Sequence, residues 1–190
     1  MARYSPEHAE ETRRSILSTC TAQIRRAGLS SVRVSALMKS AGLTHGGFYR
    51  HFASRDALLM EAATSAMSQG ARWLQQALLR KGASLENLAA VYLSEAHRDD
   101  PAVGCALPSI GPEVARLPGD ARRAFTAALN EELMLIRMQL PLSHPNPDQA
   151  AWGVLSAMVG GLILARLVPD EATSRQVLAA ARRAAVNAAN

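Results

Sequence analysis

The side chains best suited to chemistry on a partner molecule lie close together between Thr44 and Arg55. The stretch Thr44-His45-Gly46-Gly47-Phe48-Tyr49-Arg50-His51-Phe52 places hydroxyl, imidazole, phenol and guanidinium groups within nine residues. Two adjacent glycines cost a helix about 1 kcal/mol each relative to alanine, so packing on an exposed face does not explain them. A backbone without side chains can instead approach a base pair or a phosphate closely. The stretch therefore predicts a surface that donates hydrogen bonds to DNA.

Two short helices are expected to position these groups. The first spans about residues 32–40, and the second runs from Thr44 to about Phe52. Ala41-Gly42-Leu43 joins them as a tight turn, which completes a helix-turn-helix pattern. In such a motif the second helix enters the major groove, and its N-terminal residues meet the base edges. Phe48 and Phe52 are four residues apart and are expected to face the core.

The charge of the chain is concentrated in the same region. Residues 1–60 hold nine Lys and Arg against four Asp and Glu, whereas residues 61–190 hold twelve of each sign. A basic segment beside a neutral remainder is the electrostatic footprint of a nucleic-acid-binding protein. A chance surface excess is the alternative that charge alone leaves open.

The sequence from Leu43 to Leu58 resembles the signature of the TetR family of transcriptional regulators. That signature joins a recognition helix ending in Tyr-x-x-Phe, here Tyr49 and Phe52, to a basic residue at the start of the next helix, here Arg55. The preceding residues, from about 30 to 42, resemble the second helix of the family. The resemblance covers about 50 residues, and the rest of the chain is similar only in its helix pattern.

The resemblance implies a DNA contact for each residue of the signature. Some would bind phosphates, which set the register, and others would lie near base edges, which carry the sequence information. The implied contacts are Thr44, Tyr49, His51 and Arg55 at phosphates, Ser31 and Arg33 at the neighbouring strand, His45, Gly46 and Gly47 at the base edges, and Arg50 as a further outward donor.

Three residues depart from the common pattern of the family. Met38 stands where a small residue is usual, which bears on how the two short helices pack. Gly47 replaces a more usual Ala, Ser or Thr and removes one base contact. Arg55 replaces the commonest residue, Lys, and keeps its charge.

Over the whole chain the sequence predicts an all-α fold of about nine helices. Hydrophobic residues make up 48% of the 190 residues, aromatic residues only 4%, and Ala and Leu carry most of the apolar content. This composition favours helices over strands. The expected division is a helix-turn-helix DNA-binding domain at residues 1–54 and a helical ligand-binding and dimerisation domain at residues 55–190.

A soluble, cytoplasmic protein without metal or cofactor is expected. Cys20 and Cys105 lie far apart and lack the spacing of a zinc site or a disulfide framework. The first residues lack the apolar core of a signal peptide. The uncharged stretch from Gln149 to Ala165 is shorter than the roughly 20 residues of a spanning helix.

Beyond the first domain, helices are expected at residues 54–81, 84–98, 120–140, 147–168 and 171–189, with a short one after Cys105. The last two carry small and apolar residues in a stripe that predicts a homodimer interface. The stripe comprises Gly153, Leu155, Ala157, Met158, Gly161, Leu162, Ala165, Val177, Leu178, Ala181 and Ala185. The alternative is that the stripe packs inside one subunit.

The resemblance also implies a small-molecule pocket in the middle helices, whose occupation releases a palindromic DNA operator. The candidate lining residues are Met67, Trp73, Tyr92, Cys105, Phe125, Met134 and Met138. Such a pocket is expected to be mainly apolar. A position at a helix start lowers a thiol pKa and makes Cys105 a candidate sensor of electrophiles, but free cysteines are usually buried and inert, and we expect the inert state here.

Two other functions remain open at this stage. Cys105 and His97 could act as nucleophile and base of an enzyme, although no oxyanion-hole motif or phosphate loop accompanies them. A DNA-binding protein without sequence preference is the second alternative, and the large neutral remainder of the chain argues against it.

Overall fold

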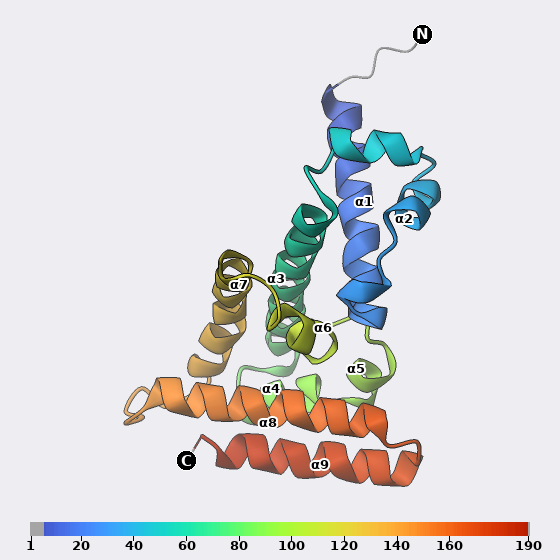
Figure 1. Cartoon of the computed structure of the whole chain (residues 1–190). Coiled ribbons are helices and arrows are strands. Elements are labelled where there is room, and N and C mark those ends of the chain that lie inside the picture. Colours follow the sequence, from blue (N-terminus) through green and yellow to red (C-terminus); the bar gives the residue numbers. More distant parts are fainter. Residues whose placement is uncertain (1–5, 190) are drawn as a thin grey trace.

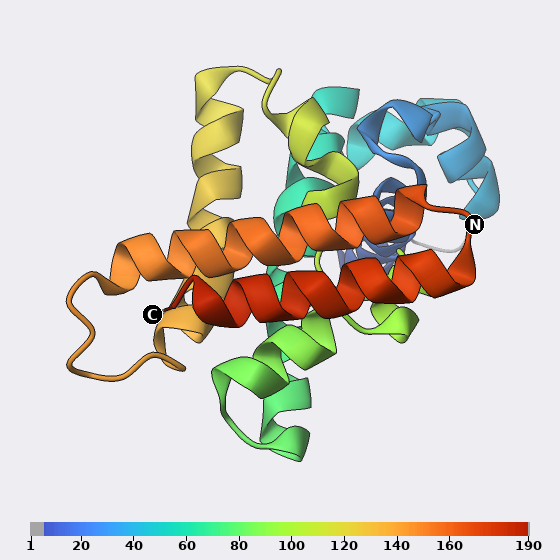
Figure 2. The same cartoon turned by 90° about the horizontal axis from the view of Figure 1, so that it is seen from below.

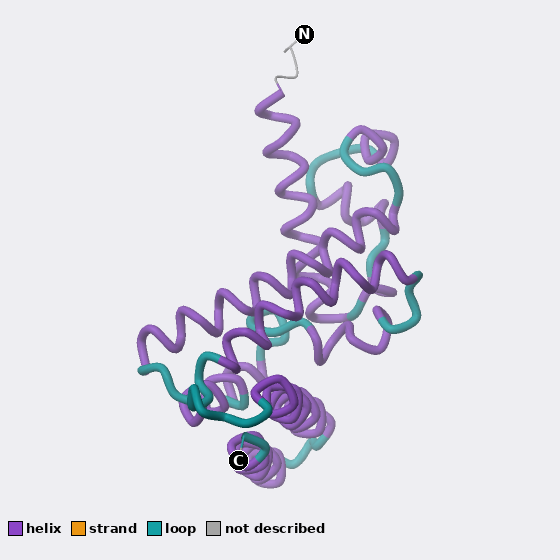
Figure 3. Tube along the Cα trace, turned by 90° about the vertical axis from the view of Figure 1, so that its left-hand side faces the viewer, coloured by secondary structure: helices purple, strands orange, loops and turns teal. Residues whose placement is uncertain are grey.

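The computed structural model describes residues 6–189, and all regular structure in this range is helical (Figures 1 and 3). The predicted all-α fold is therefore confirmed. The elements are α1 (Pro6–Ala27), η1 (Leu29–Ser31), α2 (Val34–Ser40), η2 (His45–Arg50), α3 (Arg55–Lys81), α4 (Leu85–Tyr92), α5 (Glu95–Asp99), α6 (Leu107–Val114), α7 (Gly119–Arg137), α8 (Pro147–Leu167) and α9 (Glu171–Asn187), with η marking 3-10 helices. We call residues 6–54 the head and residues 55–189 the body.

Helix α1 forms because its apolar residues share one face. Ile16, Cys20 and Ile24 follow at four-residue spacing, and each is fully buried. The helix ends at Ala27, and Gly28 takes the positive φ of +81° that glycine adopts without strain.

Helix α3 connects the head to the body. It begins where the Ser54 hydroxyl accepts a hydrogen bond from the Ala57 N–H at 3.0 Å, and it ends at Gly82, where φ is +96°. Arg13 of α1 forms a two-pronged ion pair with Glu61 of α3, at 2.7 and 2.6 Å. The first turns of α3 therefore belong to the packing of the head, and its last turns belong to the body.

The single helix predicted over residues 84–98 is wrong, because the structure divides it into α4 and α5. Leu93 leaves the helical conformation after Tyr92, and Ser94 then caps α5 by accepting a hydrogen bond from the His97 N–H at 3.2 Å. A serine that bonds to backbone ahead of it favours a new helix start over a continuing helix. The break turns His97 inward, where it is buried.

Helices α8 and α9 run side by side in opposite directions across one end of the body (Figure 2). Their contact is close, since a Cβ at Gly161 would overlap with the Cβ of Ala181. By length and composition α8 could also cross a membrane, but 44% of that stretch is already buried in the body. Its exposed side carries Trp152, Leu164 and Leu167, so α8 has one apolar face that this chain does not cover.

Candidate nucleic-acid interface

The turn between α2 and η2 gives the helix-turn-helix its angle. The Leu43 N–H donates to the Met38 carbonyl at 2.9 Å, and the Gly42 N–H donates to the Lys39 carbonyl at 3.1 Å. Gly42 has a φ of +72°, which L residues with a side chain rarely adopt. The predicted Ala41-Gly42-Leu43 turn is confirmed.

The second element of the motif is a 3-10 helix, not the α-helix expected up to Phe52. The Gly47 N–H donates to the Thr44 carbonyl at 3.0 Å, which is an i+3 contact. Two adjacent glycines weaken the α-helical alternative, and six residues are too few for packing to restore it. The Thr44 side chain makes no capping bond, and Thr44 is exposed.

Two aromatic side chains fix η2 to the head. Phe48 and Phe52 are 1% and 3% exposed, and their stacked rings have centroids 5.7 Å apart. Arg13 of α1 lies over the Phe52 ring with its guanidinium carbon 4.8 Å from the centroid. Met38 packs against η2, because its methyl carbon is 3.7 Å from the position that a Cβ at Gly47 would take. The large residue at position 38 therefore supports η2 from the buried side.

The opposite face of η2 points to solvent. Tyr49 is 67% exposed, and Thr44, Arg50 and Arg33 are exposed as well. A Cβ at Gly46 would meet no atom within 4 Å, so the fold itself does not require glycine there. A bare backbone flanked by a phenol, a hydroxyl and guanidinium groups is suited to a close approach to DNA.

The other predicted contact residues are partly engaged within the head. The Ser31 hydroxyl donates to the Gly28 carbonyl at 2.7 Å. Arg55 donates to the carbonyls of Leu29 and Val32, each at 3.3 Å, so it also ties α3 to the chain before α2. His51 is half-buried. For His45 the backbone is described, and its side chain lies outside the described part.

Replacing Tyr49 with alanine should weaken DNA binding about tenfold or more at every sequence, because a phosphate contact carries no base preference. The free energy of unfolding should change by less than about 0.5 kcal/mol, since the phenol is exposed. Electrophoretic mobility shift with random and selected duplexes measures the DNA affinity, and urea unfolding measures the free energy of unfolding. Unchanged affinity would show that η2 does not face DNA.

A carboxylate of the body holds the base of the head. Glu113 of α6 accepts hydrogen bonds from the Leu29 N–H at 2.6 Å and the Ser30 N–H at 2.9 Å. Burial alone raises the pKa of Glu113, but these backbone donors outweigh burial, and its pKa lies below its ordinary value. A Cβ at Gly28 would stand 2.5 Å from the Glu113 carboxylate, so the contact also requires glycine there.

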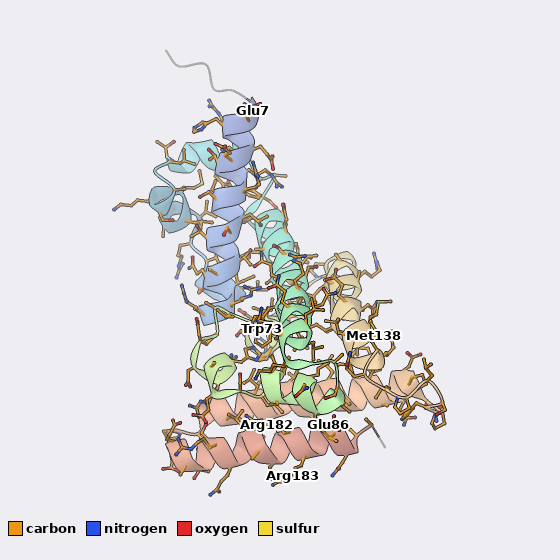
Figure 4. The ribbon with its side chains drawn as sticks, turned by 180° about the vertical axis from the view of Figure 1, so that it is seen from behind. Glu7, Trp73, Glu86, Met138, Arg182 and Arg183 are labelled. Carbon is orange, nitrogen blue, oxygen red and sulfur yellow. The ribbon has the colours of Figure 1, made fainter. Side chains whose placement is uncertain are left out.

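Replacing Glu113 with alanine should lower the free energy of unfolding by about 2 kcal/mol, because two N–H groups lose a charged acceptor. DNA affinity should fall with it, since the turn before α2 loses its attachment to the body. Glu113→Gln keeps one acceptor oxygen, so its stability and DNA affinity should lie between those of the wild type and those of Glu113→Ala. The exposed Glu86, on α4 (Figure 4), supplies the control Glu86→Ala, whose effect should stay within about 0.5 kcal/mol. Equal losses of stability in Glu113→Ala and Glu86→Ala would contradict the attachment of the head by Glu113.

The predicted effector residues do not share one environment. Met67, Tyr92, Cys105 and Phe125 are buried, and Trp73 is half-buried. Met134, on the outer face of α7, and Met138, directly after that helix, are 61% and 71% exposed, which is not the burial expected of residues that line an enclosed pocket. Leu133 and Ile136 occupy the inner face instead. In Figure 4 Trp73 and Met138 lie on opposite sides of α3.

Cys105 is not in the environment expected for a reactive thiol. It precedes α6 by two residues, is 2% exposed, and donates from Sγ to the Glu132 carboxylate at 3.2 Å. Burial, followed by the charge of Glu132, raises the pKa of Cys105 well above its ordinary value. The lowering that a helix start would cause is absent, because removal from water and a neighbouring carboxylate both oppose the thiolate, which agrees with the expected inert, buried cysteine.

One open cleft lies between head and body. It measures about 600 Å³ and is lined by Leu29, Ser30, Arg55, Asp56, Ala57, Leu59, Met60, Glu113, Arg116, Leu117 and Pro118. The predicted effector residues are absent from this lining. Within residues 6–189 no group of three or more His, Cys, Asp or Glu is placed to hold a metal ion.

The predicted dimer stripe is divided between two faces. Leu155, Met158, Gly161, Leu162, Ala165, Leu178 and Ala185 are buried within the chain, and Gly153, Ala157, Val177 and Ala181 are half-buried. Much of the stripe thus packs α8 against α9 and the body. The exposed apolar residues of α8, with the half-buried Val159 and Ile163, form a separate face that the sequence analysis missed.

Glu132 and Arg25 are among the buried charged residues that the sequence analysis missed. Glu132 is 1% exposed on the apolar face of α7, and Arg25 is 7% exposed near the end of α1. A carboxylate between Leu129 and Leu133 in an apolar stripe was a readable signal. No comparable signal marks Arg25, whose partners, the carbonyls of Ala66 and Ala102, are distant in sequence.

The head therefore contains a helix-turn-helix motif. Its second element, η2, is anchored by buried phenylalanines and exposes hydrogen-bond donors to solvent. Residues 16–62 match the family described as bacterial regulatory proteins, tetR family. Over 61 residues the chain is 36% identical to the HTH-type transcriptional regulator AcrR of Shigella flexneri, which is 32% of this chain and 28% of that protein. The head and the first turns of α3 are therefore similar in sequence to this family.

Solved structures of transcriptional regulators have a similar fold over nearly the whole chain. The reduced form of E. coli NemR superimposes with a TM-score of 0.72 at 20% identity, covering 91% of this chain and 96% of that one. A TetR-family regulator from Cytophaga hutchinsonii gives 0.76 at 16% identity, covering 94% and 95%. At these identities the likeness concerns the fold, so the body is TetR-like in architecture.

Proposed function

We propose that this chain is a cytoplasmic, homodimeric repressor that binds a palindromic DNA operator and is released by a small effector. The observation that carries the proposal is the outward face of η2, where Tyr49, Thr44 and Arg50 surround the bare backbone of Gly46. The basic excess of residues 1–60 supports the same partner, since phosphate attraction supplies much of DNA affinity.

The uncovered face of α8 supports the homodimer. Trp152, Leu164 and Leu167 are 46%, 55% and 70% exposed, which is unusual for large apolar residues clustered on one helix. A second copy related by a two-fold axis would cover this face with its own α8 and α9. Two heads would then be able to read half-sites about 34–36 Å apart.

The effector belongs in the body, and we keep a small apolar or electrophilic molecule as its broad class. The Glu113 carboxylate of the body holds the base of the head through the Leu29 N–H, so a change of body shape would reach the head. The buried state of Cys105 makes reversible binding the better supported route than attack on its thiol.

Selection of bound sequences from a random duplex pool at about 150 mM salt tests the proposal, because much of the nonspecific phosphate attraction is screened there. The wild-type chain should enrich a palindrome. Leu164→Glu should dissociate the dimer in analytical ultracentrifugation and lose the palindrome. The matched control is Leu79→Glu, at an 81% exposed leucine of α3, which should keep both. No enrichment by a folded dimer would overturn sequence-specific repression.

A further inference from the structure

The open cleft between the head and the body has the size of a ligand site. Its volume is about 600 Å³, and small-molecule sites in proteins usually measure about 300–1,000 Å³. Three segments line it: Leu29 and Ser30 of η1, the first turns of α3, and the chain from Glu113 to Pro118. A ligand held there would therefore touch the head and the body at once.

Much of the wall of this cleft is apolar. Leu29 of the head and Leu59 of the body are 5% and 6% exposed, and Met60 and Leu117 are half-buried. Each of these side chains lines the cleft with the part of its surface that remains uncovered. An apolar chain laid against them would lose contact with water, which favours binding.

Arg55 adds a fixed positive charge to the cleft. Its Nε and Nη2 atoms donate to the carbonyls of Leu29 and Val32 at 3.3 Å, and these contacts hold the plane of the guanidinium. Its Nη1 atom lies 3.8 Å from the Asp56 carboxylate, which is too far for a hydrogen bond. The Nη1 edge is thus suited to a carboxylate brought by a ligand, because guanidinium and carboxylate groups pair in one plane.

The other charged residues of the lining also favour an acidic ligand. Arg116 is exposed, and its charge helps to lower the pKa of Glu113 without forming an ion pair with it. Both Glu113 oxygens already accept hydrogen bonds, from the Leu29 and Ser30 N–H groups. The Asp56 side chain is 89% exposed, so water screens its charge. The cleft therefore offers two guanidinium groups, whereas its own carboxylates are occupied or screened.

We propose that this cleft binds a small carboxylate with an apolar chain, and that this molecule is the effector. The carboxylate pairs with Arg55 and Arg116, and the chain lies against Leu29, Leu59 and Leu117. An amphipathic anion thus takes the place of the broad apolar class given above. The site itself stands on the contacts of the cleft, whereas its regulatory role rests on the proposed function.

Arg55 connects the cleft to DNA binding. It is one of the predicted phosphate contacts, and it opens α3 directly after the cap residue Ser54. A carboxylate bound at Nη1 takes the donor that a phosphate would need, so the ligand and DNA compete for one guanidinium. Since coupling between two binding sites is reciprocal, each partner weakens the binding of the other by the same factor.

Hexanoate and 1-hexanol form a matched pair of probes, because they have the same carbon skeleton and differ in charge. Amide NMR spectra of the full chain during titration measure their affinities. Both should bind in the millimolar range through the apolar wall, and hexanoate should bind about fivefold more tightly. The largest shifts should lie at Leu29, Leu59 and Leu117. Equal affinities, no shifts up to about 50 mM, or shifts centred on the core around Cys105 would overturn the proposal.

Arg116→Gln tests the charge at the cleft without altering a predicted DNA contact. It should weaken hexanoate about threefold and leave 1-hexanol unchanged, because only the carboxylate meets this side chain. The matched control is Arg80→Gln, which removes the same charge from an exposed arginine near the other end of α3 and should leave both affinities unchanged. Equal weakening of hexanoate by the two variants would indicate general attraction to a basic protein and would contradict the site.

DNA affinity measured with and without hexanoate, with sodium chloride keeping the ionic strength equal, tests the regulatory role separately. DNA binding that is about threefold weaker or more in the presence of hexanoate supports both the site and the competition at Arg55. Hexanoate bound in the cleft with no change in DNA affinity supports the site and contradicts its regulatory role. Failure to enrich a palindrome would contradict the proposed function and would leave the NMR result for the cleft standing.

Discussion

Replacing Gly161 with alanine should lower the free energy of unfolding by about 2 kcal/mol, although alanine is the better helix former by about 1 kcal/mol. The added Cβ would overlap with the Cβ of Ala181, and neither belongs to a flexible side chain that can turn away. Helices α8 and α9 must therefore separate along their contact. Urea unfolding followed by circular dichroism, at one fixed protein concentration, measures the change.

The neighbouring residue provides the control. A Cβ at Gly160 would meet no atom within 4 Å in the same helix. Gly160→Ala should therefore keep or raise the stability by up to about 1 kcal/mol. Loss of stability in Gly160→Ala, with none in Gly161→Ala, would mean that α8 is rotated about its axis relative to the arrangement described.

Replacing Glu132 with glutamine should stabilise the protein progressively relative to wild type as the pH rises from about 4.5 to about 7. Burial raises the pKa of Glu132 from 4.5 to about 7, and the hydrogen bond from Cys105 and the charge of Arg25 oppose this rise. A raised pKa in the folded state contributes stability below pH 4.5, and that contribution is lost as the pH rises through about 7. The difference between variant and wild type should reach about 3 kcal/mol.

His97 should show the opposite sign. Burial lowers its pKa from 6.5 to about 4, so its contribution is present above pH 6.5 and is lost as the pH falls through about 4. The stability of His97→Gln relative to wild type should therefore increase as the pH falls, whereas that of Glu132→Gln should increase as the pH rises toward neutral. Unfolding by urea at half-unit pH steps measures both. A Glu132→Gln difference that does not change with pH would show that this carboxylate is not buried in solution.

Local features made the head predictable. The turn at Gly42 and the anchors Phe48 and Phe52 depend on residues only a few positions apart. The 3-10 form of η2 was not predicted, since both helix types leave Tyr49 outside and the phenylalanines inside. The exposed donors of the interface thus followed from spacing, and the helix type did not.

The body was less predictable because its environments depend on contacts between distant segments. Met134 was expected inside from its residue type, although the inner face of α7 is set by its packing against α3 and α8. Glu132 was overlooked because carboxylates are usually exposed. Arg25 became part of the body only through carbonyls more than forty positions away along the chain.

The attachment of the head at one end of α1 makes that helix a lever. Arg25 is held by the body, whereas Arg13 lies beside the Phe52 end of the DNA-facing segment, about 18 Å further along the axis at 1.5 Å per residue (Figure 1). A tilt of about 10° at the fulcrum would move the reading edge by about 3 Å. In a two-fold pair the displacements would add, so a small rearrangement near Arg25 would suffice to spoil the spacing of the half-sites.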